Sequence, residues 1–542
     1  MYNMFYVTTT IPMSKKEEFA INVIQKKLFT PLVSIANSIS YHEIEMPNWN
    51  DLREVIPNYD IWDQYRNSLE WLIYIHDVWK VNKNAQYLDF IVNIINNWLD
   101  MFKTPGKYHS RLIWCDHAVS CRIIVFLTIF DSFNESNLLG LLKHDIKEVI
   151  QQHVAFLYEW IKNNHTRTHN HILIACISIV YDILYFEKTD EDNDKLKYCS
   201  NIIENYTVSN FDSGINIENS PGYQFHVLVY LTRYLYFITK NFPNSDVLTP
   251  KMKETFQESV YYLSVFKRQN KTVPVIGDSN LTLDIFAAFS EEYNNLDMMI
   301  SYLQEKKIIN ITETFDGIKY TFISKPTTGY TFMLKNDYQL IIRSNPIIYN
   351  WHTHNDQLSI NYFRDGIDWI TDVGSYPDKR DYCISRIAHN IVLRNMENED
   401  TIKDKYHYEV VNDTHVIITM ETSKFVHNRE IIWENEHQLC IKDKLKNVNE
   451  NEQCIFNQIF HVNNNVSVDY ENKQLITLNY KNNKLMIKQN NDIYINVYNG
   501  SEEPYLGWVC YNASKMENTN TLVYNSPKCN QFEFITYFMY AS

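Results

Sequence analysis

The chain has 542 residues and a formal net charge of −15. This length exceeds the size at which one hydrophobic core keeps growing, so we expect two domains. Hydrophobic residues make up 45% of the sequence, while Gly (11) and Pro (14) are scarce, which excludes collagenous, low-complexity and mostly disordered classes. The acidic balance argues against broad binding to nucleic acids or anionic membranes, although a local cluster of cations or a bound metal can still hold a small anionic substrate.

The nine cysteines are scattered and never form a Cys-x-x-Cys pair. This is typical of a reduced compartment and not of a disulfide framework or a zinc ribbon. The first residues lack the basic and apolar regions of a signal peptide, and apolar stretches such as residues 123–130 are too short to span a bilayer. We therefore expect no membrane insertion and a cytoplasmic protein, unless it is exported by an unseen route or its signal has been removed.

Apolar residues recur at helical spacing through the first 310 residues. One series begins at Ile61, Tyr65 and Leu69. Further helices are expected over residues 84–103, 113–133, 138–163, 169–186, 221–241, 249–268 and 281–305. With short polar connections and no strand candidates between them, these segments predict stacked antiparallel helix pairs: a bundle, a solenoid, or pairs closed into a toroid.

Beyond residue 315 the apolar period falls to two, which is typical of half-buried strands. Strands are expected over residues 319–323, 331–334, 339–343, 416–420, 475–480 and 493–497. Asp365-Gly366 supplies the positive φ values of a type I′ turn and predicts a hairpin. The sequence thus predicts a helical domain over 1–310 and an antiparallel sandwich over 311–542, and the lack of βαβ alternation argues against Rossmann and TIM architectures.

Two predicted helix starts carry candidate polar groups. Thr168 can cap a helix that has Asn170 and His171 in its first turn, where unpaired N–H groups and the helix dipole favour an anion. A Ser-Pro-Gly capping sequence starts a later helix and places Tyr223 and His226 on one face, three residues apart. Each could equally be an ordinary cap with a hydrogen-bonded Tyr or His.

The densest group of proton-transfer and metal-ligand side chains lies between residues 351 and 390. His352 and His354 are two residues apart and so project from one face of an extended segment. Their companions are Asp356, Asp372, Tyr382 and His389. A purely structural strand pair has no use for this density, so the segment predicts an enzyme.

In this order along the chain, the residues resemble the heparinase II and III group of polysaccharide lyases and the related alginate lyases. The matching motifs are Asn170-His171, the stretch 219–223, His352-x-His354-x-Asp356, Gly366 to Tyr376, and Tyr382-x-x-Ser385-x-x-Ala388-His389-Asn390, with weaker matches at Trp114, Arg122, His427-x-Arg429 and Asp443. The resemblance implies an incomplete (α/α) toroid followed by an antiparallel β-sandwich. It also implies cleavage of a polysaccharide that contains uronic acid, glycosaminoglycan-like or alginate-like, by β-elimination.

The residue types suit that reaction. The enzyme must neutralise the uronate carboxylate, remove the proton at C5 and protonate the leaving oxygen on C4. The resemblance implies that Asn170 and His171 neutralise the carboxylate. It gives the base and acid roles jointly to Tyr382, Tyr223 and His352. Because a tyrosine base needs nearby cations or donors to favour the phenolate, the clustered histidines and Arg386 are expected to supply them.

The remaining residues implied by the resemblance bind substrate or metal. The resemblance assigns substrate binding to Trp114, Arg122, His226, Arg386 and His389. It assigns the ligands of a structural zinc ion to His354, Asp372 and a later histidine, with His407 preferred over His389.

The strand register tests this zinc site. A regular hairpin at Asp365-Gly366 pairs Ser359 with Asp372 and puts Asp372 on the wrong face relative to His354. The zinc site therefore requires a bulge or bend between Asn355 and Leu358. A regular hairpin would exclude the metal and leave the lyase prediction intact.

Two other functions stay open. A glycoside hydrolase on a similar toroid needs two carboxylates that flank the bond, and Glu218 and Asp278 are the candidates. A non-catalytic carbohydrate-binding or capsule-assembly protein would keep the fold without turnover. In each case the expected partner is an anionic polysaccharide or oligosaccharide. The sequence also leaves open whether the protein is a monomer or a homo-oligomer.

Overall fold

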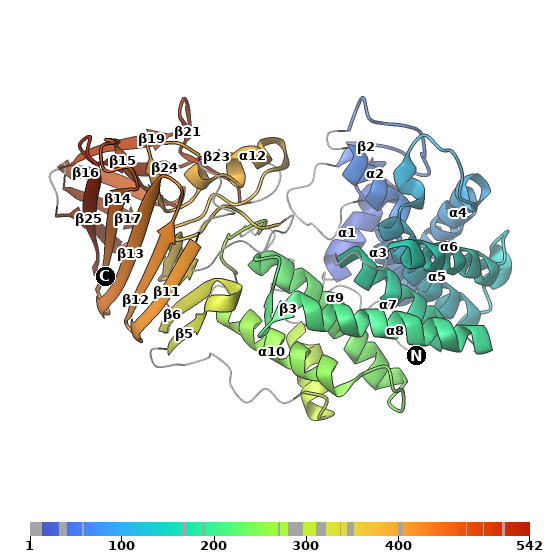
Figure 1. Ribbon diagram of the computed structural model, residues 1–542. Helices are drawn as coiled ribbons and strands as arrows, with labels where there is room; N and C mark the ends of the chain where they lie inside the picture. Colours follow the sequence, from blue (N-terminus) through green and yellow to red (C-terminus); the bar gives the residue numbers. More distant parts are fainter. Residues whose placement is uncertain are drawn as a thin grey trace. The chain divides into compact units, whose positions relative to one another are not determined.

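The computed structural model describes residues 13–31, 41–56, 59–164, 170–186, 189–268, 272–279, 296–309, 321–335, 338–343, 352–398, 405–472, 474–490, 493–511 and 515–541. The chain divides into two compact units, coloured along the sequence in Figure 1. The helical unit comprises Met1–Asn210, Val227–Gln257 and Asp284–Asn310, and the sheet unit comprises Phe211–His226, Glu258–Leu283 and Ile311–Ser542. The domain boundary between residues 310 and 311 falls outside the described residues and stays a prediction.

The helical unit is built from helices that follow one another along the chain. They are α1 (Met13–Ile24), α2 (Tyr59–Ser68), α3 (Leu72–Asn82), α4 (Ala85–Phe102), α5 (Asp116–Glu135), α6 (Ile146–Asn164), α7 (Asn170–Tyr185), α8 (Asp190–Asn210), most of α9 (Pro221–Asn241) and the start of α10 (Pro250–Phe266). Of the helix expected over 281–305, residues 296–305 are described and are helical. Among the described residues, no helix combines the length and apolarity needed to cross a bilayer.

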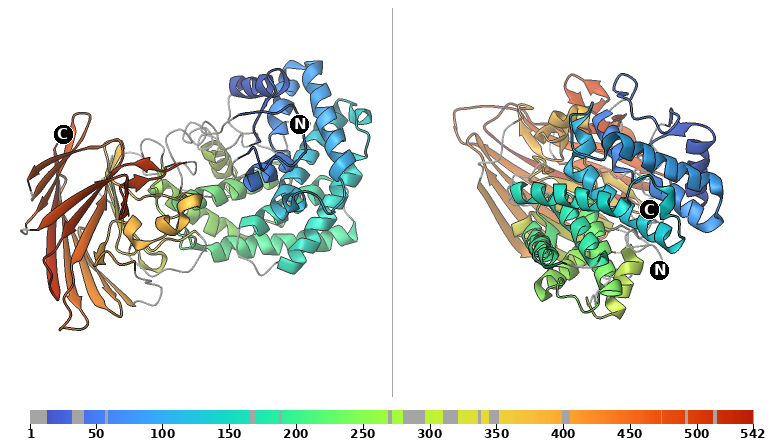
Figure 2. Two further views of the ribbon diagram at one scale, coloured as in Figure 1. Left: turned by 90° about the horizontal axis from the view of Figure 1, so that it is seen from above. Right: turned by 90° about the vertical axis from the view of Figure 1, so that its right-hand side faces the viewer.

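Helix α7 is the centre of the helical unit. Every residue from Ile172 to Leu184 is buried, because α5, α6 and α8 all pack against this helix. The two ribbon views in Figure 2 show these helices lying alongside one another. The sequence reasoning missed α8, which opens with three acidic residues and buries few of its side chains, so its apolar period is weak.

The sheet unit contains three large antiparallel sheets. One has five strands in sequential order, namely β5 (Thr321–Lys325), β6 (Tyr330–Lys335), β7 (Tyr338–Arg343), β8 (Ile360–Arg364) and β9 (Ile367–Ile370). A second has the order β10 (Val392–Arg394), β15 (Phe456–His461), β24 (Asn520–Asn525) and β19 (Tyr494–Asn499). The third has the order β11 (Lys405–Asn412), β12 (His415–Glu421), β13 (Phe425–Asn435), β14 (Gln438–Asn447), β25 (Gln531–Ala541), β18 (Asn483–Gln489), β17 (Leu475–Tyr480) and β16 (Ser467–Asn472).

These sheets form a sandwich around one apolar core. In β12, β13 and β25 buried and less buried residues alternate, as expected for a sheet with one face on a core. The core joins side chains of this sheet, such as Ile431 and Phe538, to Leu340 of β7 and Phe460 of β15. A bridge between Ile370 and Val462 connects the five-stranded and four-stranded sheets. Together they make the second layer of the sandwich.

The second layer is buried on both faces. Strands β7, β9 and β15 have no exposed residue, so their outer face is covered. Part of this cover is the segment that follows α10, where the buried guanidinium of Arg268 donates to Gln339 (3.0 Å), Asp368 (2.8 Å) and Asn361 (2.6 Å). These bonds hold Arg268 on the sheet, and its backbone N–H donates at 2.9 Å to the carbonyl of Thr272, the first residue of the segment 272–279 that carries Asp278.

The hairpin between β8 and β9 is not regular. Arg364 pairs with Ile367 around Asp365-Gly366, as predicted, but Tyr362 pairs with Ile370 while Phe363 pairs with Asp368. Trp369 is thus the extra residue of a bulge. A bend also occurs at Leu358, whose φ is +69°. The chain therefore has the irregularity that the metal site requires: a bend in the expected segment and a bulge that was not foreseen.

Gly374 provides a test of this packing. Its φ is +81°, and an added Cβ would lie 2.1 Å from the carbonyl oxygen of Cys510. We expect Gly374→Ala to destabilise the sheet unit by about 2–5 kcal/mol, since left-handed strain and overpacking add. The matched control is Gly366→Ala, where φ is +83° but no atom lies within 4 Å of the added Cβ, so only about 1–2 kcal/mol is lost. Calorimetric unfolding of both variants measures the difference, and equal losses would contradict the packing.

Candidate functional site

The carboxylate of Asp278 lies at the centre of the polar cluster in the sheet unit. Its Oδ2 is 2.8 Å from His352 Nδ1, its Oδ1 is 2.9 Å from His354 Nε2, and Arg380 donates to both oxygens at 2.9 and 2.8 Å. Burial would raise the pKa of Asp278, but the hydrogen bonds from both histidines and the charge of Arg380 outweigh it and hold the pKa well below its usual range. The group is therefore a carboxylate at neutral pH.

A tight turn brings Asp278 to the two histidines. Gly277 has a φ of +60°, and a Cβ there would lie 2.8 Å from the carbonyl oxygen of Asn219 and 2.9 Å from that of His352. The backbone N–H of Asp278 donates to the same His352 carbonyl at 3.1 Å. Glycine is needed because a side chain at this left-handed position would separate the two segments. The sequence Gly277-Asp278 is thus what places the carboxylate.

Tyr223 lies directly against His352. Their ring centroids are 3.6 Å apart with planes inclined by 22°, and the His226 ring meets Tyr223 edge-on at 6.1 Å. Burial raises the pKa of Tyr223, and the charges of Asp278 and Glu218 raise it further against the opposite effect of Arg380. Tyr223 is therefore a protonated phenol that can donate.

Glu218 is the second carboxyl group of this cluster. It is buried, and burial followed by the charge of Asp278 raises its pKa, with His352 opposing. Because Asp278 is fully engaged by three donors, it is not available to act on a glycosidic bond as a nucleophile or base. The structure thus gives no support to the glycoside hydrolase interpretation.

Tyr382 lies on the short helix α12 (Arg380–Cys383). Its hydroxyl is buried, with no hydrogen-bond partner among the described residues. Burial raises the pKa of Tyr382, and nearby groups, Cys383 first, raise it further. The expectation that Arg386 would favour the phenolate is not met, because Arg386 is buried in the sandwich with its guanidinium against Met420 Sδ at 3.7 Å.

Three buried side chains form a candidate metal centre: His354, Asp372 and His389. His389 Nδ1 is 2.9 Å from Asp372 Oδ2. His354 Nδ1 and His389 Nε2 are buried nitrogens without a hydrogen-bond partner among the described residues. Two imidazoles and one carboxylate are a ligand set that zinc accepts. Asp278, which is hydrogen-bonded to His354 Nε2, would hold that ring with Nδ1 toward the metal. The residues therefore fit a zinc ion.

The structure corrects the third member of this set. His407, the histidine that the resemblance preferred, is an exposed residue of β11 that pairs with Thr419 across the sheet. His389, which was expected to bind substrate, is fully buried beside Asp372. The preference failed because the spacing along the sequence does not reveal that residues 386–389 turn back onto the Asp372 segment.

In the helical unit, α7 begins at Asn170, so Asn170 and His171 do occupy its first turn. The capping residue Thr168 lies outside the described residues. His171 Nδ1 is 2.6 Å from Asp116 Oδ2. Burial would raise the pKa of Asp116, but the hydrogen bond from His171 outweighs it and lowers that pKa. Asn170 and His171 are both partly exposed, which suits a substrate-binding role.

Trp114 and Arg122 do not share that exposure. Arg122 is fully buried, donates to the Asn67 carbonyl at 2.7 Å and to His153 Nε2 at 3.2 Å, and lies over the Trp98 ring. Burial lowers the pKa of Arg122 to about 9. The Trp114 indole donates to the Phe102 carbonyl at 2.9 Å. Both residues thus make packing contacts within the helical unit, and their substrate contact stays a prediction.

Sequence reasoning missed two residues that the structure places at these sites. Arg380 has no motif around it, and only the position of Asp278 reveals its partner. Asp116 opens α5 as an ordinary acidic first-turn residue, so its contact with His171, 55 positions away, could be found only from the fold. Asp278 was considered, but only as a hydrolase carboxylate.

Comparison with known structures defines the fold. The chain is similar to a crystal structure of heparinase III (14% identity, 99% of this chain, 86% of that one, TM-score 0.75) and to a heparinase III gene product (15%, 99%, 86%, 0.70). It is also similar to heparan sulfate lyase HepC from Pedobacter heparinus (15%, 100%, 86%, 0.66). This likeness confirms the fold class: an incomplete (α/α) toroid followed by an antiparallel β-sandwich.

The sequence comparison covers the sheet unit. Residues 319–534 match the family model described as heparinase II/III-like, C-terminal. No curated protein matches the chain.

The choice between His389 and His407 can be tested by metal analysis. We expect His389→Gln to lose one equivalent of bound zinc per chain, because it removes one of three ligands from a buried site. His407→Gln, the matched control on exposed β11, should keep the zinc content of the unmodified protein. Elemental analysis of the purified variants measures this, with circular dichroism as a check of folding. Loss of zinc in the His407 variant alone would contradict the assignment.

Proposed function

We propose that the protein is a polysaccharide lyase that cleaves a polysaccharide containing uronic acid by β-elimination. The observation that carries this proposal is the stacked pair of Tyr223 and His352, with the Asp278 carboxylate hydrogen-bonded to His352, in a chain whose residues 319–534 match the heparinase II/III-like C-terminal family model. The pair offers a proton acceptor and a proton donor side by side, which is what elimination across C4 and C5 requires.

Asp278 sets the tautomer of His352. A carboxylate accepts hydrogen bonds and does not donate them, so the Nδ1 of His352, 2.8 Å from Asp278, carries the proton. In the neutral ring Nε2 then holds the lone pair and can accept a proton. We assign the base role to His352 Nε2 and the acid role to the phenol of Tyr223, whose pKa is raised by burial and by Asp278.

The reaction balances with these two groups. The base takes the C5 proton, the C5–H electron pair forms the C4–C5 double bond, and the C4–O bond breaks with its electrons on the leaving oxygen. The acid then protonates that oxygen. Substrates of opposite configuration at C5 present the proton to the other face, and for them the tyrosines and the histidine would exchange roles.

Other residues would bind and orient the substrate. Asn170 and His171 are proposed to neutralise the uronate carboxylate, with the His171 ring held by Asp116. Tyr382 is proposed as a donor, because burial raises its pKa and so favours the protonated phenol. A zinc ion held by His354, Asp372 and His389 would supply structural rigidity: His354 shares the Asp278 carboxylate with His352, so fixing His354 also fixes the carboxylate that orients the base.

A screen of uronate polymers tests the proposal. Because the similar solved structures include heparan sulfate lyases, heparan sulfate is the first substrate to test, followed by hyaluronan, chondroitin and alginate. We expect ultraviolet absorbance from the new C4–C5 double bond. Tyr223→Phe, which removes the proposed acid, should lower the rate by about 10²–10⁴-fold, the range for loss of a proton-transfer group. Tyr494→Phe, at an exposed position of β19, should retain the full rate. New reducing ends without absorbance, or binding of every polymer without product, would contradict a lyase.

Asp278 gives a second test. Asp278→Asn keeps the shape of the side chain but can present its amide to His352 Nδ1, which favours the wrong tautomer of the base. We expect kcat to fall by about 10²–10⁴-fold, the range seen when a carboxylate that orients a catalytic histidine is replaced. Asp381→Asn, an exposed position on the same helix as Arg380, is the control and should change kcat by less than about twofold. Equal kcat values for the two variants would contradict the proposed role of Asp278 in setting the tautomer of His352.

A further inference from the structure

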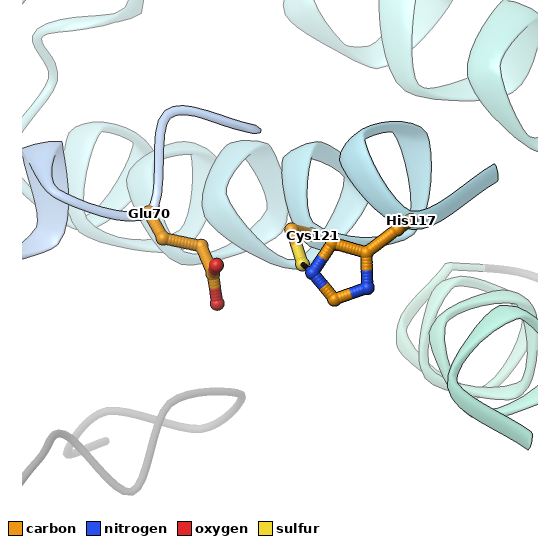
Figure 3. A group of neighbouring side chains, drawn as sticks. All are labelled: Glu70, His117 and Cys121. Carbon is orange, nitrogen blue, oxygen red and sulfur yellow. Dashed lines mark hydrogen bonds between the residues drawn. The ribbon is translucent and has the colours of Figure 1, made fainter. Parts of the chain in front are cut away.

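A second group of metal-ligand side chains lies in the helical unit. Glu70, His117 and Cys121 each place one ligand atom within 4.8 Å of those of the other two. Figure 3 shows the three side chains extending to the same side of α5. His117 and Cys121 are four residues apart on this helix, so they share one face, and Glu70 comes from the segment just before α3.

The distances suit a bound ion. His117 Nε2 is 3.8 Å from Cys121 Sγ. Nitrogen and sulfur ligands of a tetrahedral zinc ion are about 3.5 Å apart, given Zn–N and Zn–S bonds of about 2.0 and 2.3 Å. A shift of a few tenths of an ångström would therefore bring His117 and Cys121 to the spacing of zinc ligands. Because two of the ligands lie on one turn of a helix and are buried, their spacing is fixed before any metal binds.

Burial distinguishes this group from an ordinary surface cluster. Cys121 is 2% exposed and His117 is 8% exposed. His117 Nε2 faces Cys121 and is the nitrogen that would bind the metal. The other ring nitrogen, Nδ1, is buried with no hydrogen-bond partner among the described residues. The group is also unsuited to be a nucleophile, because burial and Glu70 raise the pKa of Cys121 well above its usual value, whereas reactive cysteines have lowered pKa values.

We propose that Glu70, His117 and Cys121 bind a zinc ion in the helical unit, separate from the His354, Asp372 and His389 centre of the sheet unit. A thiolate, an imidazole and a carboxylate form a mixed set that zinc accepts and that magnesium and calcium do not favour. Three protein ligands leave the fourth tetrahedral position to water or another small ligand. His117 lies next to His171, with ring centroids 5.5 Å apart, so the ion would stiffen the helix start that carries Asn170 and His171.

The presence of sulfur makes the two metal sites distinguishable by spectroscopy. A thiolate bound to Co²⁺ gives near-ultraviolet charge-transfer absorption that nitrogen and oxygen ligands do not give, and the sheet-unit centre contains no cysteine. We expect this absorption when Co²⁺ is added to the full-length protein purified without metal. Cys121→Ser should abolish it. Cys383→Ser, which removes another buried thiol close to Asp372, should leave it unchanged.

A variant at the less buried ligand keeps the test decisive if Cys121→Ser fails to fold. Glu70→Gln retains the thiolate absorption but should weaken Co²⁺ binding by about tenfold or more in competition with a chelator, since the charged ligand is lost. Circular dichroism checks the fold of each variant. The proposal is overturned if the unmodified protein shows no thiolate absorption, if the absorption persists in Cys121→Ser or disappears in Cys383→Ser, or if Glu70→Gln binds Co²⁺ with unchanged affinity.

Discussion

The ionised carboxylate of Asp278, held among His352, His354 and Arg380 at 2.8 to 2.9 Å, is the interaction on which the candidate site depends. A carboxylate removed from water is stable only when donors replace its hydration. Here the donors come from segments 74 to 102 positions away in the sequence. Removing the charge would leave a guanidinium and two imidazoles without their acceptor. One side chain therefore determines both the orientation of the proposed base and the position of a proposed metal ligand.

The sandwich supplies the rigidity that this arrangement needs. Arg429 of β13 is fully buried, paired with Asp443 of β14, and donates to the backbone carbonyls of Leu358 and Asn390 at 2.5 and 2.7 Å. Leu358 ends the segment that carries His354, and Asn390 follows His389. A charged pair on one layer of the sandwich thus holds the two backbone segments that bring the metal-centre histidines together. The weaker motif matches at His427-x-Arg429 and Asp443 thus fall on residues that hold the backbone of the sheet unit.

The fold was predictable because its signals are local. The period of apolar residues separates helices from strands without any knowledge of tertiary contacts. The sequence analysis did not single out α8, with its acidic start, or strands such as β13 and β25. Asp365-Gly366 likewise predicted its own turn. The pairing of side chains was much less predictable. His352 and His354 were recognised from their spacing, but their shared partner Asp278 lies about 75 positions earlier, and the Trp369 bulge that shifts the hairpin register has no sequence signature.

Charge adds a constraint on how an anionic polysaccharide can be held. The net charge of −15 repels a polyanion at long range, but screening limits that repulsion to about 8 Å at physiological salt. Attraction must then come from groups at close range. In the sheet unit Arg380 is partly exposed while its guanidinium is bound to Asp278, so most of its charge is already neutralised. A guanidinium cannot give its full charge to a substrate and to Asp278 at once. Under the proposed function, binding strength would therefore come from other groups, such as His171, whose ring is partly exposed and paired with Asp116.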